Sequence, residues 1–343
     1  MTDLKKRITI KEIAKAAGVS VGTVDRVLHN RGEVAQATKK LVRQIAEEGN
    51  YSTNVFARTL KLNKIFNIAV VLPEDNEYWK TQRLGIENAA AEFESLGLQV
   101  NFFTFDRSDQ TSFMNESARA ISSGPDGVVI APLLDKEARE VCQSMDVAKI
   151  PYTFVDSTLK ETFPLSFVGQ DTVQSGFLAA KLLNYGFENG YPAWIIKYSD
   201  YDIWNKTVTE RIAGFRKFYL ENGWNENLIT ECELTETLSP TEFGNQPLHI
   251  FVPNSRAHRV LDWMRQHQIK TIGRVVGYDQ IPQNIDELKT GAIDFIINQN
   301  PWRQGYLSIR SLYNHLIVNT EVEKLQYMPV EIVTKENLEF TGQ

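Results

Sequence analysis

Four polar residues of this chain directly follow apolar, strand-like runs. Asp156 follows PYTFV and Asp279 follows RVVGY, whereas Asn254 follows LHIFVP and Gln299 follows FIIN. Ligands of parallel α/β folds bind at the carboxyl ends of strands, so these side chains are suited to hydrogen-bond a hydroxylated ligand. A single polar residue at a strand end is more often a local cap, but several at matching positions favour a binding site. The two carboxylates could also act as general acid and base, although hydroxyl binding is the simpler role.

The chain lacks the patterns of common catalytic centres. It contains no G-x-x-x-x-G-K-[ST], G-x-G-x-x-G, H-E-x-x-H or G-x-S-x-G motif. Its five histidines and two distant cysteines, Cys142 and Cys232, do not have metal-ligand spacing. We therefore expect no enzyme activity, no cofactor and no metal, and we expect both cysteines to be small buried hydrophobes.

The start of the chain is basic and has residues suited to reading DNA. Residues 1–60 hold eleven Lys and Arg against six Asp and Glu, a net charge of +5, so the other 283 residues sum to −11. This asymmetry indicates a polyanion partner for the first segment alone. Within it, a helix VGTVDRVLHN that begins after Ser20 would present its first turns to the major groove, at Val21, Gly22, Thr23, Asp25 and Arg26. Arg26 could make a bidentate contact to guanine, worth roughly 1–3 kcal/mol of discrimination.

Three short helices are expected to position these residues. The first ends at Gly18, Ser20 is expected to be the N-cap of the second, and the third runs from about Ala35 to Glu48. Ile10, Ile13, Ala14 and Ala17 have helical spacing, and an apolar stripe in the second helix comprises Val21, Val24, Val27 and Leu28. In the third helix, the residues expected to face inward are Leu41, Val42 and Ile45. A tight turn containing glycine between the first two helices is typical of a helix-turn-helix.

From Ile65 onward, apolar runs alternate with amphipathic helices. The runs are FNIAVVLP, LQVNFFTF, GVVIAP, PYTFVD, PAWIIKYS, LHIFVP, RVVGYD and FIINQ, with helices expected near 80–96, 111–122, 136–147, 206–222, 255–267 and 284–290. This alternation predicts an α/β fold with parallel sheets, and the number of strands favours two similar lobes. We expect a head at 1–49, a hinge at 50–64 and a sensor at 65–343, with lobe 1 at about 65–168 and 298–327 and lobe 2 at about 169–297 and 328–343.

The head resembles the DNA-binding domain of the lactose-repressor (LacI/GalR) family. The matching features are the AGVS turn, TV-x-RVL, V-x-x-x-T and N-x-x-A-R-x-L, in order over about fifty residues. The resemblance implies that Val21 and Gly22 choose bases and that Leu60 is the hinge leucine, which wedges into the minor groove. Thr23, Tyr51 and Asn54 are donors suited to phosphates. The chain departs from the family at Asp25 (usually serine), His29 (commonly asparagine) and Thr53 (usually proline), so the operator sequence is hard to predict.

The body is similar to the type I periplasmic sugar-binding fold that this family uses as its sensor, closest to ribose-binding proteins. The resemblance implies that Asn76, Tyr78 and Trp79 in EDNEYW offer an amide and two aromatics that sandwich a pyranose. It also implies that Arg211 is the ligand-binding arginine, and it places Asp156, Asn254, Asp279 and Gln299 around the ligand. Ser255 departs from the usual Asn-Asp, and Trp204 and Trp302 are secondary candidates. Gln170 and Asp171 match the crossover into lobe 2, where Asp171 is expected to cap a helix.

These features predict a transcription regulator, most simply a repressor, whose affinity for double-stranded operator DNA depends on a sugar or polyol in the cleft. We expect a cytoplasmic homodimer, because no signal peptide or membrane span is present in the sequence. A purine or nucleoside effector is the alternative. A transport binding protein without a DNA-binding role, or a DNA-binding protein with an inactive pocket, is less consistent with these features.

Overall fold

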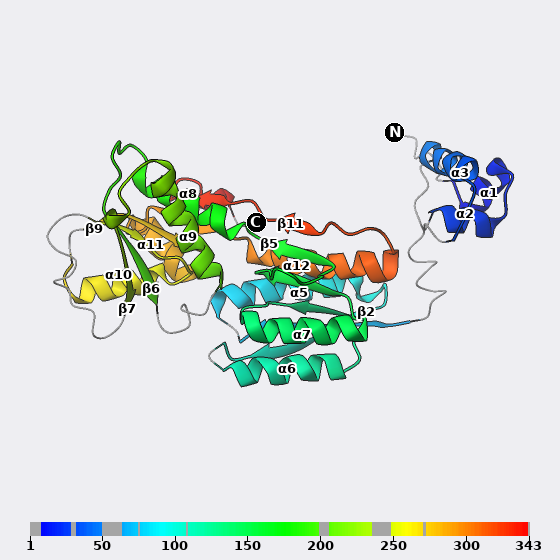
Figure 1. The fold of residues 1–343 in the computed structure, drawn as a ribbon, viewed down its shortest axis with the longest axis horizontal. Coiled ribbons are helices and arrows are strands. Elements are labelled where there is room, and N and C mark those ends of the chain that lie inside the picture. Colours follow the sequence, from blue (N-terminus) through cyan, green and yellow to red (C-terminus); the bar gives the residue numbers. More distant parts are fainter. Residues whose placement is uncertain are drawn as a thin grey trace. The chain divides into compact units, whose positions relative to one another are not determined.

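The computed structural model describes residues 8–28, 32–49, 64–74, 76–107, 109–198, 206–234, 248–269 and 272–341. The chain divides into two compact units. One comprises Met1–Ile65 with Tyr313–Val322, and the other comprises Phe66–Leu312 with Glu323–Gln343. Figure 1 shows the helical head and the two-lobed body.

The head is a three-helix unit formed by α1 (Ile10–Ala17), α2 (Val21–Leu28) and α3 (Gln36–Glu48). Gly18 ends α1 in the left-handed conformation (φ 67°), and the Ser20 hydroxyl accepts from the Thr23 amide at 3.1 Å, so the expected stop and N-cap are both confirmed. The α1 helix also begins with a capping box between Thr9 and Glu12, which was not anticipated. The buried core of the head comprises Ile13, Ala14, Val24, Val27, Val42 and Ala46.

One apolar residue of the head was wrongly placed inward. Leu41 is 44% exposed. Val21, which begins the apolar stripe of α2, is 43% exposed, as a residue proposed to contact DNA would have to be. The buried stripe of α3 contains Val42 and Ala46, which are four residues apart and therefore share one face of the helix. Leu41 is turned away from that stripe by one residue step.

Lobe 1 is built on a six-stranded parallel sheet in the order β11-β5-β4-β3-β1-β2. Its strands are β1 (Phe66–Pro73), β2 (Leu98–Phe105), β3 (Gly127–Ile130), β4 (Tyr152–Asp156), β5 (Ser166–Gly169) and β11 (Leu325–Tyr327). Figure 1 shows α5 (Glu77–Glu94) and α12 (Pro301–Tyr313) on one face and α6 (Gln110–Ser122) and α7 (Asp135–Ala148) on the other. Because both faces are covered, β1, β3, β4 and β5 consist almost entirely of buried residues.

Lobe 2 repeats this arrangement with the strand order β12-β10-β9-β8-β6-β7. Its strands are β6 (Ala193–Tyr198), β7 (Ile229–Leu234), β8 (Leu248–Phe251), β9 (Ile272–Tyr278), β10 (Phe295–Asn298) and β12 (Glu331–Val333), of which β12 is antiparallel to its neighbour. The helices are α8 (Thr172–Asn184), α9 (Lys206–Glu221), α10 (Ala257–Gln266) and α11 (Pro282–Thr290). Short 3-10 turns lie at η2 (Glu226–Leu228) and η5 (Leu338–Phe340). A π-helical segment, η4 (Asn314–Val318), directly follows α12. The two-lobed parallel architecture was therefore predicted correctly, whereas β5, β7, β11, β12 and α12 were missed.

Close helix contacts recur in both lobes. A Cβ on Gly85 of α5 would lie 1.9 Å from the Trp302 carbonyl oxygen of α12, and one on Gly214 of α9 would lie 1.9 Å from the Val173 carbonyl oxygen of α8. Each helix pair therefore packs backbone against backbone, at a distance that only glycine permits. These pairs hold Arg211 of α9 and the start of α12 in fixed positions next to the ends of the strands.

Candidate functional site

The second helix of the head exposes the residues expected to read DNA. Val21, Gly22 and Arg26 are exposed, and Thr23 and Asp25 are half-buried. The Arg26 Nε donates to the Gly22 carbonyl oxygen at 3.2 Å, which holds the guanidinium along the same face as Gly22. A Cβ on Gly22 would meet nothing closer than the Ser20 hydroxyl at 3.8 Å, so packing of the head itself does not require glycine there. His29, Tyr51, Asn54 and Leu60 lie outside the described residues.

The body contains a buried cluster of charged and polar side chains at the carboxyl ends of strands. Asp156, Arg211, Asp279 and Gln299 are exposed by only 6%, 3%, 3% and 4%. The Gln299 Nε2 donates to both Asp279 carboxylate oxygens, at 2.9 and 3.0 Å. The Tyr78 hydroxyl donates to Asp156 Oδ1 at 2.5 Å. Four of the residues predicted from separate strand ends or helices are thus buried and hydrogen-bonded within one compact body.

Arg211 is held by contacts on several sides. Its Nη1 donates to the Pro253 carbonyl oxygen at 2.8 Å and its Nη2 donates to Gln299 Oε1. The guanidinium carbon lies 3.8 Å from the centroid of the Tyr278 ring, a cation–π contact between two buried side chains. Within the described part of the chain, its Nε has no hydrogen-bond partner. A buried guanidinium donor without a partner is a position where a ligand oxygen would be stabilised.

Burial raises the pKa of three side chains in this cluster, Asp279, Asp156 and Tyr78. Desolvation raises the pKa of Asp279 to about 7, although Arg211 and Gln299 favour its charged form. Burial also raises the pKa of Asp156, opposed by the Tyr78 hydrogen bond and by Arg211. The pKa of Tyr78 is raised by the same loss of water and by the nearby Asp156, so its hydroxyl stays protonated and remains a donor.

Four of the predicted residues have local structural contacts. The Asn76 side chain is the N-cap of α5 and accepts from the Trp79 amide at 3.0 Å. The Asn254 Oδ1 accepts from the Arg256 amide at 2.9 Å. The rings of Tyr78 and Trp79 are both buried and meet edge to face at 87°, with centroids 5.0 Å apart. They therefore do not enclose a pyranose between parallel faces, because each packs against the other.

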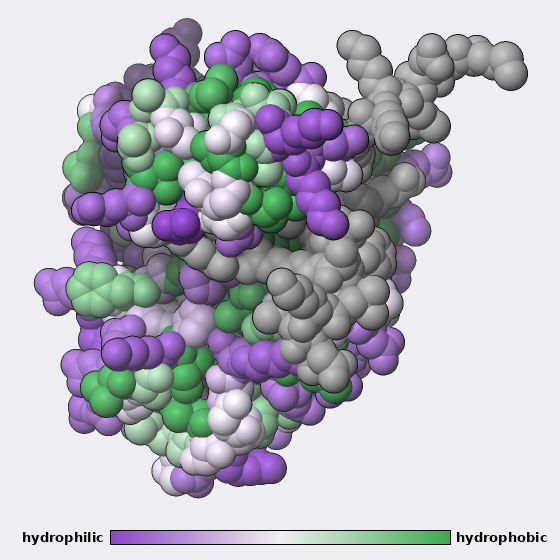
Figure 2. Space-filling model, turned by 90° about the vertical axis from the view of Figure 1, so that its right-hand side faces the viewer, coloured by the Kyte–Doolittle hydropathy of each residue, from purple (hydrophilic) through white to green (hydrophobic). Residues whose placement is uncertain are grey.

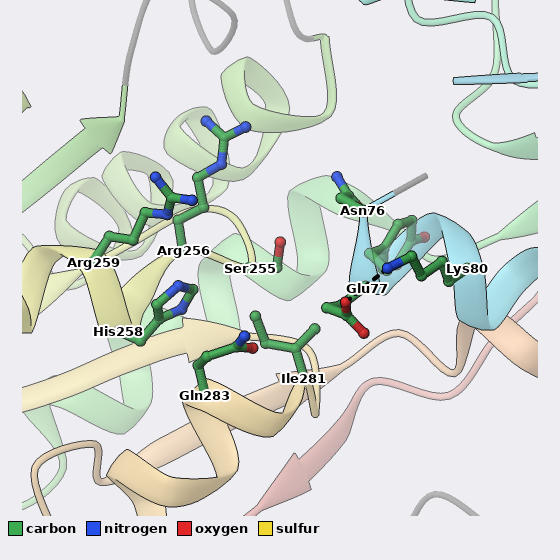
Figure 3. A pocket seen from close by; sticks show the side chains of 10 residues that line it. Asn76, Glu77, Lys80, Ser255, Arg256, His258, Arg259, Ile281 and Gln283 are labelled. Atoms are coloured by element: carbon green, nitrogen blue, oxygen red, sulfur yellow. Dashed lines mark hydrogen bonds and ion pairs between the residues drawn. The ribbon is translucent and has the colours of Figure 1, made fainter. Parts of the chain in front are cut away.

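Two cavities lie between the lobes and share Tyr78 and Ile281. The smaller, of about 100 Å³, is lined by Tyr78, Asp279, Asn298 and Trp302, among others. The larger, of about 270 Å³, extends from Asn76 and Lys80 of lobe 1 to Arg259 of lobe 2 (Figure 3). Trp302, a secondary candidate, lines the smaller cavity and stacks on Tyr306. Trp204 lies outside the described residues.

The described surface offers little that suggests a different class of site. On the face shown in Figure 2, hydrophilic residues lie among hydrophobic ones. In the described ranges, no helix is long and apolar enough to cross a bilayer. The same ranges contain no group of three or more His, Cys, Asp or Glu side chains placed to hold a metal ion.

Comparison with known proteins identifies both parts of the chain. Residues 9–54 match the model for bacterial regulatory proteins of the lacI family, and residues 68–320 match the periplasmic binding protein domain. The HTH-type transcriptional regulator DegA of Bacillus subtilis is 29% identical over 260 residues, which cover 72% of this chain and 73% of that protein. This chain belongs to the LacI family of transcriptional regulators. It is a DNA-binding regulator with a periplasmic-binding-protein-like sensor.

Solved structures agree with this assignment. A LacI-family protein of Bacteroides fragilis, described as a transcriptional regulator, has a TM-score of 0.71 and 28% identity and covers 80% of this chain and 99% of its own. A solute-binding protein of Agrobacterium vitis, with bound α-D-tagatopyranose, has a TM-score of 0.68 and 22% identity and covers 80% of this regulator and 96% of its own chain. The second likeness shows the fold alone.

Sequence reasoning missed several residues that organise the sensor of this LacI-family regulator. The Gln304 Oε1 accepts from the Asp156 amide at 3.1 Å, and its Nε2 donates to the Gln299 carbonyl oxygen at 2.9 Å. Gln304 thus links the strand end of lobe 1 to the segment that carries Gln299. The Lys206 Nζ of lobe 2 donates to the Thr158 carbonyl oxygen of lobe 1 at 2.5 Å. The basic run SRAHR after Asn254 was visible in the sequence and could have indicated the arginines of the larger cavity.

Proposed function

We propose that this LacI-family regulator is a homodimeric repressor whose operator affinity is set by a small polyhydroxylated effector bound between the lobes, without turnover. The observation that supports this most directly is the buried cluster of Asp156, Arg211, Asp279 and Gln299. Carboxylates, an amide and a guanidinium in a water-poor site match the alternating donors and acceptors of a sugar or polyol. An apolar ligand would leave these groups unpaired, at a cost of about 1–3 kcal/mol each.

We further propose which segments of the chain form its domains and which residues contact DNA or the effector. Residues 1–49 form the head, residues 50–64 the hinge, and residues 65–343 the sensor, with lobe 1 at about 65–168 and 298–327 and lobe 2 at about 169–297 and 328–343. Val21, Gly22, Thr23, Asp25, Arg26, His29, Tyr51, Asn54 and Leu60 are proposed to contact DNA. Asn76, Tyr78, Trp79, Asp156, Arg211, Asn254, Asp279, Gln299 and, secondarily, Trp204 and Trp302 are proposed to surround the effector. We propose that the regulator is cytoplasmic, because its proposed partner is operator DNA.

The mechanism follows from where the polar groups lie. Asp156 and Tyr78 belong to lobe 1, whereas Arg211 and Asp279 belong to lobe 2. A ligand that hydrogen-bonds both sets has a higher affinity for the arrangement in which the lobes are close together. It therefore shifts the population toward that arrangement, by no more than the difference in its affinity for the two states. In a dimer, a change in the lobe angle would alter the spacing of the two heads, and operator DNA would reciprocally alter effector affinity.

Thermal-shift screening and isothermal titration against sugars, polyols, sugar phosphates and nucleosides would identify the effector, and gel-shift titration would report DNA affinity. Arg211→Gln should abolish the effector response and retain DNA binding. Arg216→Gln on the same helix is the matched control, because Arg216 is part of a surface ion pair with Glu231 at 3.1 Å. A wild-type response in Arg211→Gln, or chemical conversion of a bound ligand, would contradict the proposal.

A further inference from the structure

Two glutamine side chains are buried where helices α5 and α12 pack together. Gln82 and Gln304 are both 0% exposed, and neither is among the described residues that line the two cavities between the lobes. The Gln82 Nε2 donates to Gln304 Oε1 at 3.3 Å, whereas the Gln82 Oε1 has no hydrogen-bond partner within the described part of the chain. An unpaired buried acceptor costs about 1–3 kcal/mol. The stability of the helix contact therefore does not explain why this pair is polar.

Gln304 also holds the backbone on both sides of the proposed effector site. Its Oε1 accepts from the Asp156 amide at 3.1 Å, and its Nε2 donates to the Gln299 carbonyl oxygen at 2.9 Å. The Gln299 side chain in turn donates to Asp279 and accepts from Arg211, which both belong to lobe 2. Gln304 thus connects an acid of lobe 1 to the residue that contacts the acid and the arginine of lobe 2.

The two backbone positions that Gln304 holds have an uncommon conformation. Asp156 has a φ of 69°, and Asn300, which directly follows Gln299, has a φ of 54°. Such a conformation costs a residue with a side chain roughly 1–3 kcal/mol and persists only where the surrounding structure holds it. Each Gln304 hydrogen bond lies on the peptide group that directly precedes one of these residues. Loss of these bonds would let the strand end and the crossover relax, which would move the Asp156 carboxylate and the Gln299 amide.

The position of Gln304 itself is fixed by close helix packing. A Cβ on Gly305, the next residue of α12, would lie 2.1 Å from the Gln82 carbonyl oxygen of α5. The two helix backbones therefore meet at this point, at a distance that only glycine permits. A rigid support of this kind keeps ligand-binding groups in a productive geometry.

Lobe 2 holds its own acid in a different way. The Asn284 Nδ2 donates to the carbonyl oxygens of Tyr278 and Asp279, at 2.8 and 3.2 Å. All three residues belong to lobe 2, so these bonds hold one strand end within its own lobe. Gln304 differs because one of its bonds lies at the end of a lobe 1 strand and the other lies on the crossover segment.

We propose that Gln304 is a positioning residue of the effector site, which makes no contact with the ligand but couples Asp156 to Gln299, so that the polar groups of both lobes are presented together. This rests on the proposed function, since it concerns how the same cleft is regulated. Without the coupling, the ligand itself would have to order one half of the site, and the entropy lost in that ordering lowers affinity.

Titration calorimetry of the full chain with a panel of aldopentoses, aldohexoses, their polyols and inositols tests this, and the probe that the wild type binds most tightly is used for the variants. Gln304→Met retains the length of the side chain and removes both backbone hydrogen bonds. We expect the affinity for that probe to fall by about tenfold or more, with operator affinity unchanged in the absence of ligand. Hydrogen exchange of the peptide that contains Asp156 should become faster, because its amide loses an acceptor.

Two matched variants separate positioning from stability. Gln82→Met replaces the other amide of the buried pair and should leave the affinity for the probe unchanged. Gln326→Met removes two hydrogen bonds elsewhere in lobe 1, to Ser166 and Ser311 at 2.9 and 2.7 Å, and should lower the Tm without lowering the affinity. If Gln304→Met alone does not fold, the double variant Gln82→Met/Gln304→Met replaces both amides by apolar groups, and we expect the same loss of affinity.

Wild-type affinity in a folded Gln304→Met variant, single or double, would overturn the inference while the proposed function stands. An equal loss of affinity in Gln326→Met would also overturn it, since the effect would then follow stability and not position. No binding of any member of the panel to the wild type would reject both proposals.

Discussion

Asp156 and Asp279 occupy equivalent positions in the two lobes. Asp156 ends β4 and Asp279 directly follows β9, and these strands have the same place in the order of their sheets. Both residues have left-handed backbone conformations, with φ of 69° and 68°. This conformation is uncommon for a residue with a side chain, and its occurrence at both strand ends fits a functional site. The cleft thus has one buried acid on each side.

The raised pKa of Asp279 predicts a pH dependence of stability. The folded protein holds a proton on Asp279 up to about pH 7, whereas the unfolded chain releases it near pH 4. In the absence of ligand, the contribution of Asp279 to the free energy of unfolding is therefore greatest below about pH 4. This contribution decreases as the pH rises to about 7. Asp279→Asn, which mimics the protonated form, should reduce the decrease in Tm between pH 5 and pH 8.

Differential scanning calorimetry at several pH values provides the measurement. Asp262→Asn on the exposed face of α10 is the control and should leave the profile unchanged. If Asp279→Asn left the pH profile of Tm as in the wild type, Asp279 would have to ionise at its ordinary pKa in the folded protein.

We predict that the Lys206–Thr158 hydrogen bond stabilises the arrangement in which the two lobes are close together. The Lys206 ammonium is the donor and comes from the first turn of α9, whereas Thr158 lies two residues after Asp156. Lys206→Met removes the donor but retains the aliphatic length of the side chain. We expect effector affinity to fall by about three- to tenfold, because one charge-assisted hydrogen bond of the closed arrangement is lost.

Titration calorimetry with the effector found in the screen would measure this change. Lys217→Met is matched to it, since Lys217 lies on the same helix and pairs with Glu221 at 3.6 Å on the exposed surface. Equal affinities of the two variants would show that the Lys206 bond does not distinguish the lobe arrangements.

The exposed face of α2 predicts which substitutions affect DNA binding. Arg26→Ala should lower operator affinity by about tenfold or more and leave effector binding intact. Gly22→Ala should fold normally, because its Cβ would meet the Ser20 hydroxyl at 3.8 Å, yet weaken DNA binding if the backbone of Gly22 approaches the bases. Gel-shift titration gives the affinities, and circular dichroism checks the fold. Arg43→Ala on α3 is the control for the loss of one positive charge. If it lowered operator affinity as much as Arg26→Ala, the effect of Arg26 would be due to charge alone and Arg26 would not recognise bases.

Local signals in the sequence predicted local structure well. The runs FNIAVVLP and LQVNFFTF coincide with β1 and β2. Strand β1 is buried along nearly its whole length, as the continuous apolar run predicts, whereas β2 at the edge of the sheet is buried only at its two ends. Asp171 caps α8 as expected, accepting from the Gln174 amide at 2.9 Å. Strand β11 was missed because it has only three residues and leaves Leu325 and Tyr327 about half exposed, so it has no apolar pattern.

Contacts between residues that are far apart in the sequence could not be predicted from these local patterns. Tyr78 was expected to stack on a ligand, but its hydroxyl bonds to Asp156, 78 residues away. Gln304 lies in α12, a helix that was not anticipated, and its role depends on the Asp156 amide 148 residues away. Such partners depend on how the lobes assemble in three dimensions. The spacing of residue types within a short stretch of sequence does not encode this assembly.

The last strands of the two sheets have a consequence for how the chain is made. Strands β11 and β12 come from neighbouring segments near the end of the sequence, and they complete different sheets. During translation, domains generally fold as units, beginning with the N-terminal one. The helices of the head can therefore be complete long before either sensor sheet has its final edge strand. A ribosome that stops before Leu325 would release a head attached to a sensor with two unfinished sheets. Such a fragment could occupy DNA without responding to the effector.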